Sequence, residues 1–170
     1  MSLFNSRERG TGMRRVHILI ALAAIMAVGF VLPAYAGGPT HRVSVGGADS
    51  TAVPKPGDDA NFSLTAMVKK DGTVSGQWQD SFGHGNGGVH VKILCLVVDG
   101  DDAWVSGVIT KASGIAEGSE GTGARTRVHD GGKSGDQISF TFFGGDPATA
   151  CEAKPLLGLF DTHNGQVKVK

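Results

Sequence analysis

Three residues of metal-binding type lie close together around the glycine-rich segment FGHGNGG. Asp80 precedes this segment, His84 lies within it and His90 follows it. Two histidines and a carboxylate are a ligand set that suits Zn²⁺ or Cu²⁺, so these residues are weak candidates for a metal site. Their spacing matches no standard zinc pattern. The alternative interpretation is a flexible turn followed by an exposed histidine at the start of a strand.

Other residues that could carry chemistry give weaker signals. Asp99, Asp101 and Asp102 resemble a fragment of a calcium loop but lack its distant bidentate glutamate. His129 and Asp130 pair a base with a carboxylate, yet no serine lies in a G-x-S-x-G turn. We therefore predict no catalytic residue and no cofactor, and an enzyme is the less favoured interpretation.

The first 36 residues have the pattern of a secretory signal peptide. A positively charged start is followed by an apolar run, Val16–Leu32, and by an A-x-A sequence at 34–36. The run is close to the lower length limit for a spanning helix, so a membrane anchor is the alternative. We predict cleavage after Ala36, a secreted or cell-envelope location and no membrane span in the mature chain. Met13 is an alternative start, and the export route stays open.

The two cysteines, Cys95 and Cys151, are predicted to form a disulfide. An exported protein is exposed to an oxidising environment, and a single disulfide between the two cysteines leaves no free thiol. The apolar neighbours of Cys95 would raise the pKa of a thiol, which argues against a catalytic role. The bridge would close a loop of about 57 residues and attach the long segment 144–164 to the sheet, a stabilisation of up to roughly 4 kcal/mol. Two buried free thiols are the alternative.

Charge argues against nucleic acid as a partner. Residues 37–170 hold 12 basic and 15 acidic side chains, a net charge of −3. The basic residues are mostly spread singly, whereas nucleic-acid binding needs a concentrated positive surface.

Alternating hydrophobicity predicts strands rather than helices after the signal peptide. Phe62, Leu64, Ala66 and Val68 fall on one face of a strand, and an Asp-Gly pair then turns the chain into a second strand with Trp78 inward. Further strands are expected at 89–98, 103–111, 124–130, 137–143 and 165–170, with an edge strand at 41–45 inside an extended lead-in, 37–59. We predict a single all-β domain, 60–170: an antiparallel β-barrel of about eight strands, with a sandwich as the alternative.

Aromatic side chains and long loops are the remaining binding candidates. Phe62, Trp78, Phe140 and Phe142 are predicted to point inward, where they would line a cavity or fill the barrel. Trp104 shares a face with Ser106 and is predicted to be exposed or cavity-lining. Glycine-rich loops are expected at 81–88 and 111–123, and 144–164 is expected to be a third long loop.

The runs CLVVDGDDAWVSGVITK and DQISFTFFGGDP, with Cys151 and the terminal NGQVKVK, resemble a set of small secreted bacterial proteins. The resemblance covers residues 62–170 and implies an antiparallel all-β domain whose two cysteines belong to the scaffold. It implies no activity, cofactor or catalytic residue. Relatives commonly have an Asp-Asn-Gly turn near His129, and the departure here weakens the case for that histidine.

Three functions follow from these observations. The first is a secreted, non-catalytic barrel that binds a ligand, for example a small apolar molecule, through its loops or one end. The second is a structural or interaction module of the cell envelope with a protein or glycan partner, which would need an exposed apolar patch. The third is a metal-dependent enzyme, which would need Asp80, His84, His90 or His129 to converge in one pocket.

Overall fold

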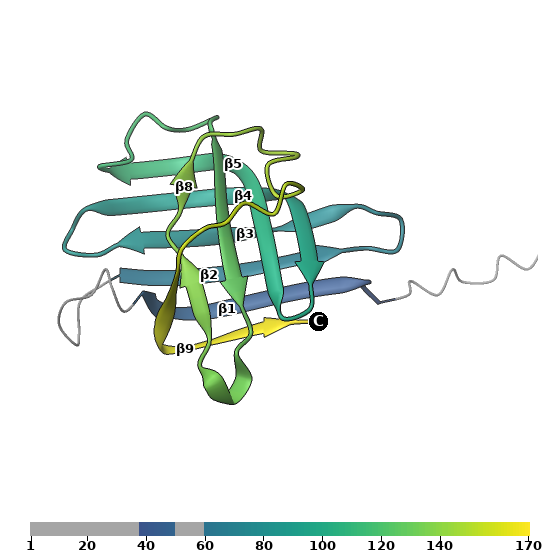
Figure 1. Ribbon diagram of the computed structural model, residues 1–170. Coiled ribbons are helices and arrows are strands. Elements are labelled where there is room, and N and C mark those ends of the chain that lie inside the picture. Colours follow the sequence, from purple (N-terminus) through teal and green to yellow (C-terminus); the bar gives the residue numbers. More distant parts are fainter. Residues whose placement is uncertain (1–37, 50–59) are drawn as a thin grey trace, which may run out of the picture. The chain divides into compact units, whose positions relative to one another are not determined.

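Nine antiparallel strands and one short 3-10 helix make up the described part of the chain (Figure 1). The computed structural model describes residues 38–49 and 60–170, all within one compact unit, Gly37–Lys170. The predicted signal peptide and residues 50–59 of the lead-in lie outside the described residues. The elements are β1 (His41–Asp49), β2 (Ala60–Val68), β3 (Val74–Phe82), β4 (Gly87–Asp99), β5 (Asp102–Gly114), β6 (Gly123–His129), η1 (Gly132–Ser134), β7 (Gln137–Ser139), β8 (Phe142–Phe143) and β9 (Leu159–Val169).

The strands form one barrel-shaped antiparallel sheet. Its order is β5-β4-β3-β2-β1-β9-β7-β6-β8, and β5 also pairs with β6, which brings the sheet round onto itself. Both β7 and β8 pair with β6, so they are two pieces of one interrupted strand in the barrel wall, here called the wall strand. The all-β class and the barrel are therefore as predicted, and this ring of pairing replaces the edges of an open sheet.

The N-terminal part of the domain differs from the prediction. The edge strand expected inside a lead-in is a longer strand, β1, which pairs with β2 on one side and with β9 on the other. Val43 and Val45 point into the core and are buried. The β9 strand likewise begins at Leu159, earlier than the alternating run at 165–170 indicates, because its first residues pair with β7. The first and last strands of the domain, β1 and β9, are therefore both part of the barrel sheet.

Side chains fill the centre of the barrel. The largest fully buried ones are Trp78, Leu64, Ile93, Ile109 and Ile138. Phe62, Leu64 and Ala66 are buried on one face of β2, as the alternating pattern predicts. Barrels of eight strands are just wide enough for side chains to fill. Phe62 and Trp78, two of the side chains predicted to line a cavity or fill the barrel, belong to this packed core.

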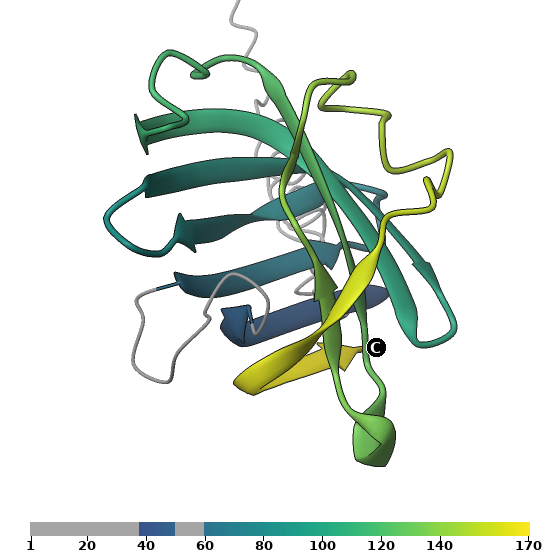
Figure 2. The ribbon, with the colours of Figure 1, turned by 60° about the vertical axis from the view of Figure 1, so that its left-hand side comes forward.

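Two irregularities interrupt the pairing of β4 with β5, and the second explains why the part of 89–98 after Lys92 is apolar on both faces. They lie at His90/Val91 and Ile93/Cys95, and Figure 2 shows both long strands curving round the barrel. After the second irregularity Leu96 packs into the main core, whereas Cys95 and Val97 belong to a separate cluster with Trp104. A β-bulge changes which residues face inward and bends the strand. Both faces of this segment are therefore covered.

The outer cluster is covered by residues 144–158, here called the strap. The predicted disulfide is present: Cys95 on β4 is bonded to Cys151 on the strap, with Cα atoms 5.9 Å apart. The indole N–H of Trp104 donates to the carbonyl of Pro155 at 3.0 Å, and the Ser106 hydroxyl donates to the carbonyl of Pro147 at 3.1 Å. Trp104 is consequently only 8% exposed, so the prediction of an exposed or cavity-lining aromatic is wrong. Within the described ranges, no helix is long and apolar enough to cross a membrane.

Candidate functional site

The long connections gather at one end of the barrel, here called the mouth. The β3–β4 loop (83–86) and the β5–β6 loop (115–122) lie there, and the strap leaves β8 at the same end. Both loops appear on the left of Figure 1. The β2–β3, β4–β5 and β6–β7 turns lie at the other end, because antiparallel neighbours alternate in direction. Recognition residues are often found on loops that a rigid scaffold holds in place.

A cavity of about 280 Å³ lies at the mouth. Its lining comprises Asp80, Ser81, Phe82, Ile115, Phe140, Thr141 and Phe143. Ile115, Phe140 and Phe143 are 76%, 41% and 45% exposed, and they are three of the four large hydrophobic side chains that stand exposed in the described chain. Single exposed apolar residues are ordinary, but three around one cavity form a patch that indicates a binding surface.

The β5–β6 loop holds Ile115 at the rim. Its backbone N–H donates to the carbonyl of Asn86 on the neighbouring loop at 3.0 Å, and the next residue, Ala116, is buried in the core. Gly87 and Gly114 let the two loops approach this closely. A Cβ on Gly114 would lie 2.0 Å from the carbonyl oxygen of Asn86, and the φ angle of Gly114 is +63°. Burial of Ala116 leaves Ile115 facing solvent.

A pair of buried hydroxyl groups interrupts the wall strand and changes the direction in which its phenylalanine side chains point. The Ser139 hydroxyl accepts the backbone N–H of Arg127 at 2.9 Å and lies 3.1 Å from the Thr126 hydroxyl, and both hydroxyl side chains are fully buried. These bonds take the place of regular pairing, so β7 ends at Ser139 and β8 begins at Phe142. The alternation that predicts Phe140 and Phe142 inward beside Ile138 is lost at this point.

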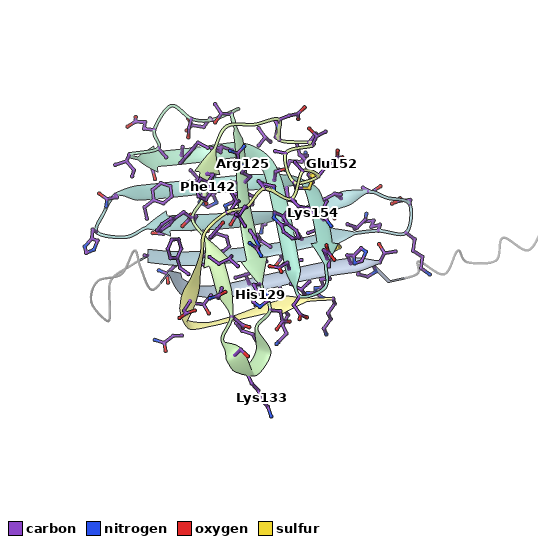
Figure 3. The ribbon with its side chains drawn as sticks, viewed as in Figure 1. Arg125, His129, Lys133, Phe142, Glu152 and Lys154 are labelled. Carbon is purple, nitrogen blue, oxygen red and sulfur yellow. A yellow bond between two sulfur atoms is a disulfide. The ribbon has the colours of Figure 1, made fainter. Side chains whose placement is uncertain are left out.

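The break in the wall strand places Phe140 and Phe143 at the cavity, and each packs against a further aromatic ring. Phe143 lies opposite the buried Ala124, and its ring packs edge-on against Phe82 at 6.4 Å. Phe140 packs against Phe160 of β9 at 4.5 Å. Phe142 lies opposite Arg125 on β6, so its side chain is on the other face of the sheet from Phe143, which lies opposite Ala124; Phe142 and Arg125 are labelled in Figure 3. The prediction of an inward Phe142 is therefore wrong, and Phe143 takes that place.

Asp80 brings a carboxylate into the mouth. It follows the buried Trp78 on the same face of β3 and lies directly opposite Phe62. The Thr141 hydroxyl donates to its Oδ2 at 2.6 Å from the far wall of the barrel. This bond joins β3 to the segment between β7 and β8, which are not neighbours of β3 in the sheet, so the carboxylate is held in one direction within an apolar rim.

The metal interpretation of Asp80, His84 and His90 gains no support from this arrangement. His90 lies opposite Gln79 and is exposed, so it points to the outer surface whereas Asp80 points to the mouth. His84 is exposed on the β3–β4 loop with a φ angle of +54°. In the part of the chain that the structure describes, no three His, Cys, Asp or Glu side chains group as a metal site would require.

The other acidic candidates have structural partners. Asp99 pairs with Lys154 of the strap at 2.7 Å, and this hydrogen bond and charge hold the pKa of Asp99 below its usual range. Asp102 binds Arg127 at 2.9 Å and lies 3.4 Å from His129. Asp130 binds Lys168 and accepts the N–H of Val169 on β9. Figure 3 labels His129 and Lys133 toward the lower end and Lys154 on the strap.

Sequence reasoning missed four residues of the site: Phe82, Ile115, Thr141 and Phe143. Alternation from Trp78 signals that Asp80 and Phe82 point inward together, so these two were open to prediction. Ile115 gives no such signal, because its exposure depends on burial of its neighbour Ala116.

Comparisons of the chain with protein-family models, with curated proteins and with solved structures found no match. The resemblance to small secreted bacterial proteins therefore stays a prediction.

Proposed function

We propose that this protein is a non-catalytic binding protein that holds a small, mainly apolar molecule with an aromatic ring at the mouth of its barrel. The observation that carries the proposal is the cavity itself, with Ile115, Phe140 and Phe143 exposed around it. Aromatic side chains offer large contact areas and favour edge-on and offset contacts with other rings. The mouth already contains two such ring pairs, so a further ring extends an existing arrangement.

The size of the cavity limits the ligand. An engineered apolar cavity of roughly 150 Å³ binds benzene, and drug-sized ligands occupy pockets of roughly 300–1,000 Å³. A cavity of about 280 Å³ that opens to solvent fits a molecule with one or two rings. The packed centre of the barrel favours binding at its end rather than in its interior.

The disulfide supports an oxidising compartment for this function. Disulfides persist in secreted and envelope proteins and are rare in the cytosol. With the signal-peptide pattern of residues 1–36, this supports a secreted or cell-envelope location.

An envelope interaction module remains the second proposal. Ile115, at 76% exposure, projects from the rim and favours a protein partner that covers the mouth. Trp104 does not contribute to the surface for this partner, because the strap covers that side chain.

Fluorescence titration with the uncharged probe N-phenyl-1-naphthylamine tests the proposed function. We expect saturable binding by the purified protein, weakened at least about tenfold by Phe143→Ser, because a polar side chain there removes a ring from the cavity wall. Leu156→Ser is the matched control, since Leu156 is 93% exposed on the strap and does not line the cavity. Absence of saturable binding, or equal losses in both variants, would contradict the proposal.

A further inference from the structure

A second cavity lies on the outer surface of the barrel, where β2, β3, β4 and β5 run side by side (Figure 1). It measures about 500 Å³ and shares no lining residue with the cavity at the mouth. Its exposed side chains are hydroxyls, amides and bases, and the bases are His90, Lys92 and Lys111. No aspartate or glutamate belongs to the described lining. This cavity, here called the outer groove, is therefore polar and positively charged.

Strand register arranges the side chains of the outer groove in two rows across the sheet. The row nearer the mouth crosses β5, β4, β3 and β2 through Lys111, His90, Gln79 and Ser63. The second row crosses β4, β3 and β2 through Lys92, Gln77 and Thr65. Every second residue of a strand faces the same side, so both rows lie on one face. The longer row spans three strand spacings, or about 14 Å.

A bulge in β5 brings the second lysine to this face. Ile109 lies opposite Val91 and Lys111 lies opposite His90, so Thr110 is the extra residue on β5. The Thr110 hydroxyl donates to the carbonyl of His90 at 3.1 Å. Regular alternation from the buried Ile109 would direct Lys111 into the core, whereas a bulge changes the direction of the side chains that follow it. Lys111 is therefore exposed beside His90.

We propose that the outer groove binds a segment of an acidic polysaccharide. The carboxylates of the sugar chain pair with Lys92 and Lys111, and its hydroxyl groups bond to Gln77 and Gln79. The outer groove and the mouth have no residue in common, so this proposal does not rest on the proposed function.

Charge complementarity favours an anionic partner. Lys92 and Lys111 are exposed, and within the described chain neither forms a hydrogen bond or an ion pair. Bonds from an ammonium group to a carboxylate are roughly twice as strong as bonds between neutral groups. Residues 37–170 carry a net charge of −3, so a polyanion is repelled by much of the remaining surface. The outer groove is thus a preferred place for an anionic chain.

The amide and hydroxyl side chains favour a sugar chain among the possible anions. A glutamine amide offers two donors and an acceptor, and a serine or threonine hydroxyl both donates and accepts. Sugar hydroxyls likewise donate and accept. Gln77 and Gln79 are exposed, and each lies between a hydroxyl side chain of β2 and a nitrogen-bearing side chain of β4.

The same lining suits other anionic surfaces less well. Single-stranded nucleic acid needs aromatic side chains on which its bases stack, and a membrane surface needs apolar side chains that insert into it. Trp78 is the one aromatic residue in the described lining, and it is buried at 1% exposure.

Calorimetric titration with tetragalacturonate and its methyl ester tests the role of charge. We expect tetragalacturonate to bind saturably and the ester, which keeps the sugar chain but has no charge, to bind at least about tenfold more weakly. Lys92→Gln with Lys111→Gln should weaken tetragalacturonate binding at least about tenfold. Lys70→Gln with Lys133→Gln is the matched control, because it removes the same charge at exposed positions outside the outer groove, and it should change the affinity less than about twofold.

Titration with tetraglutamate tests the preference for a sugar chain. We expect this peptide to bind at least about fivefold more weakly than tetragalacturonate. Gln77→Ala with Gln79→Ala should bring the two ligands within about twofold of each other, because it removes the amides and keeps both lysines. All these substitutions lie at exposed positions, and an unchanged urea midpoint shows that each variant is folded.

Three results would overturn the proposal. They are no saturable binding of tetragalacturonate, equal losses in the two lysine double variants, and tetraglutamate binding as tight as that of tetragalacturonate. The last result would favour an acidic peptide segment as the partner. Each of them leaves naphthylamine binding at the mouth unaffected, so the proposed function is tested separately.

Discussion

Removal of the disulfide by Cys95→Ala with Cys151→Ala should release the strap and leave the barrel folded. The bridge joins residues 56 positions apart, and the chain-entropy model assigns a loop of that length about 4 kcal/mol. Without it, the strap keeps two hydrogen bonds to β5, the bond from the Gly144 N–H to the carbonyl of Gly123 on β6, and the pair of Lys154 with Asp99. Each hydrogen bond contributes about 1 kcal/mol, and the ion pair adds little because both of its side chains are exposed to solvent.

The disulfide ties the strap covalently to the sheet. Ordering a segment costs backbone conformational entropy, and in the double variant the contacts named above must oppose that cost without a covalent tie. The barrel core keeps its own packing, because the outer cluster of Cys95, Cys151 and Trp104 is separate from it. We therefore expect local detachment of the strap and a loss of about 2–4 kcal/mol in the free energy of unfolding.

Acrylamide quenching of tryptophan fluorescence measures the detachment. The chain has two tryptophans, Trp78 in the barrel core and Trp104 under the strap, 1% and 8% exposed. The native protein should resist quenching, whereas in the double variant Trp104 should become accessible and Trp78 should not. Ser106→Ala is the control, because it removes one strap bond but keeps the disulfide. Unchanged quenching, with a free energy of unfolding within about 1 kcal/mol of the native value, would refute this reasoning.

Three further changes test how the barrel is held together. The pKa of Asp130 is lowered, because desolvation, which raises it, is outweighed by bonds from the Val169 N–H and from Lys168. Its stabilisation is therefore present above the unfolded pKa of about 3.9 and is lost as the pH falls through the folded pKa. Urea unfolding should show the native protein more stable than Asp130→Asn at pH 6, with a difference that shrinks toward pH 2; a constant difference would contradict the assignment. Gly114→Ala should cost about 2 kcal/mol or more, because its Cβ would overlap the Asn86 carbonyl at a positive φ; a native-like urea midpoint would contradict this. Ser139→Ala should cost about 1–3 kcal/mol by leaving buried partners unsatisfied, and a calorimetric melting temperature equal to the native value would count against the role of that hydroxyl.

The strands with regular alternation were predictable from sequence. The β2–β3 hairpin is the clearest case: the Asp71 carboxylate accepts the Thr73 N–H at 2.9 Å within the predicted turn, and Leu64 lies opposite Trp78 in the core. The disulfide was predictable because the signal-peptide pattern predicts export and two cysteines leave one pairing.

The site was less predictable because it depends on contacts between distant segments. Phe143 replaces Phe142 at the mouth because a Ser139 bond to β6 interrupts the alternation. Trp104 is buried because the strap, about fifty residues later in the chain, folds over it. Neither contact can be inferred from the local pattern of polar and apolar residues.

Methyl-detected NMR of isoleucine tests ligand binding at the mouth most directly. After residue 37 the chain has four isoleucines: Ile115 at the mouth, and Ile93, Ile109 and Ile138 at 1% exposure in the core. Titration with N-phenyl-1-naphthylamine should move the Ile115 methyl signal along a saturable curve and leave the three core signals nearly unchanged. Equal shifts of all four signals, or no saturable shift at Ile115, would contradict binding at the mouth.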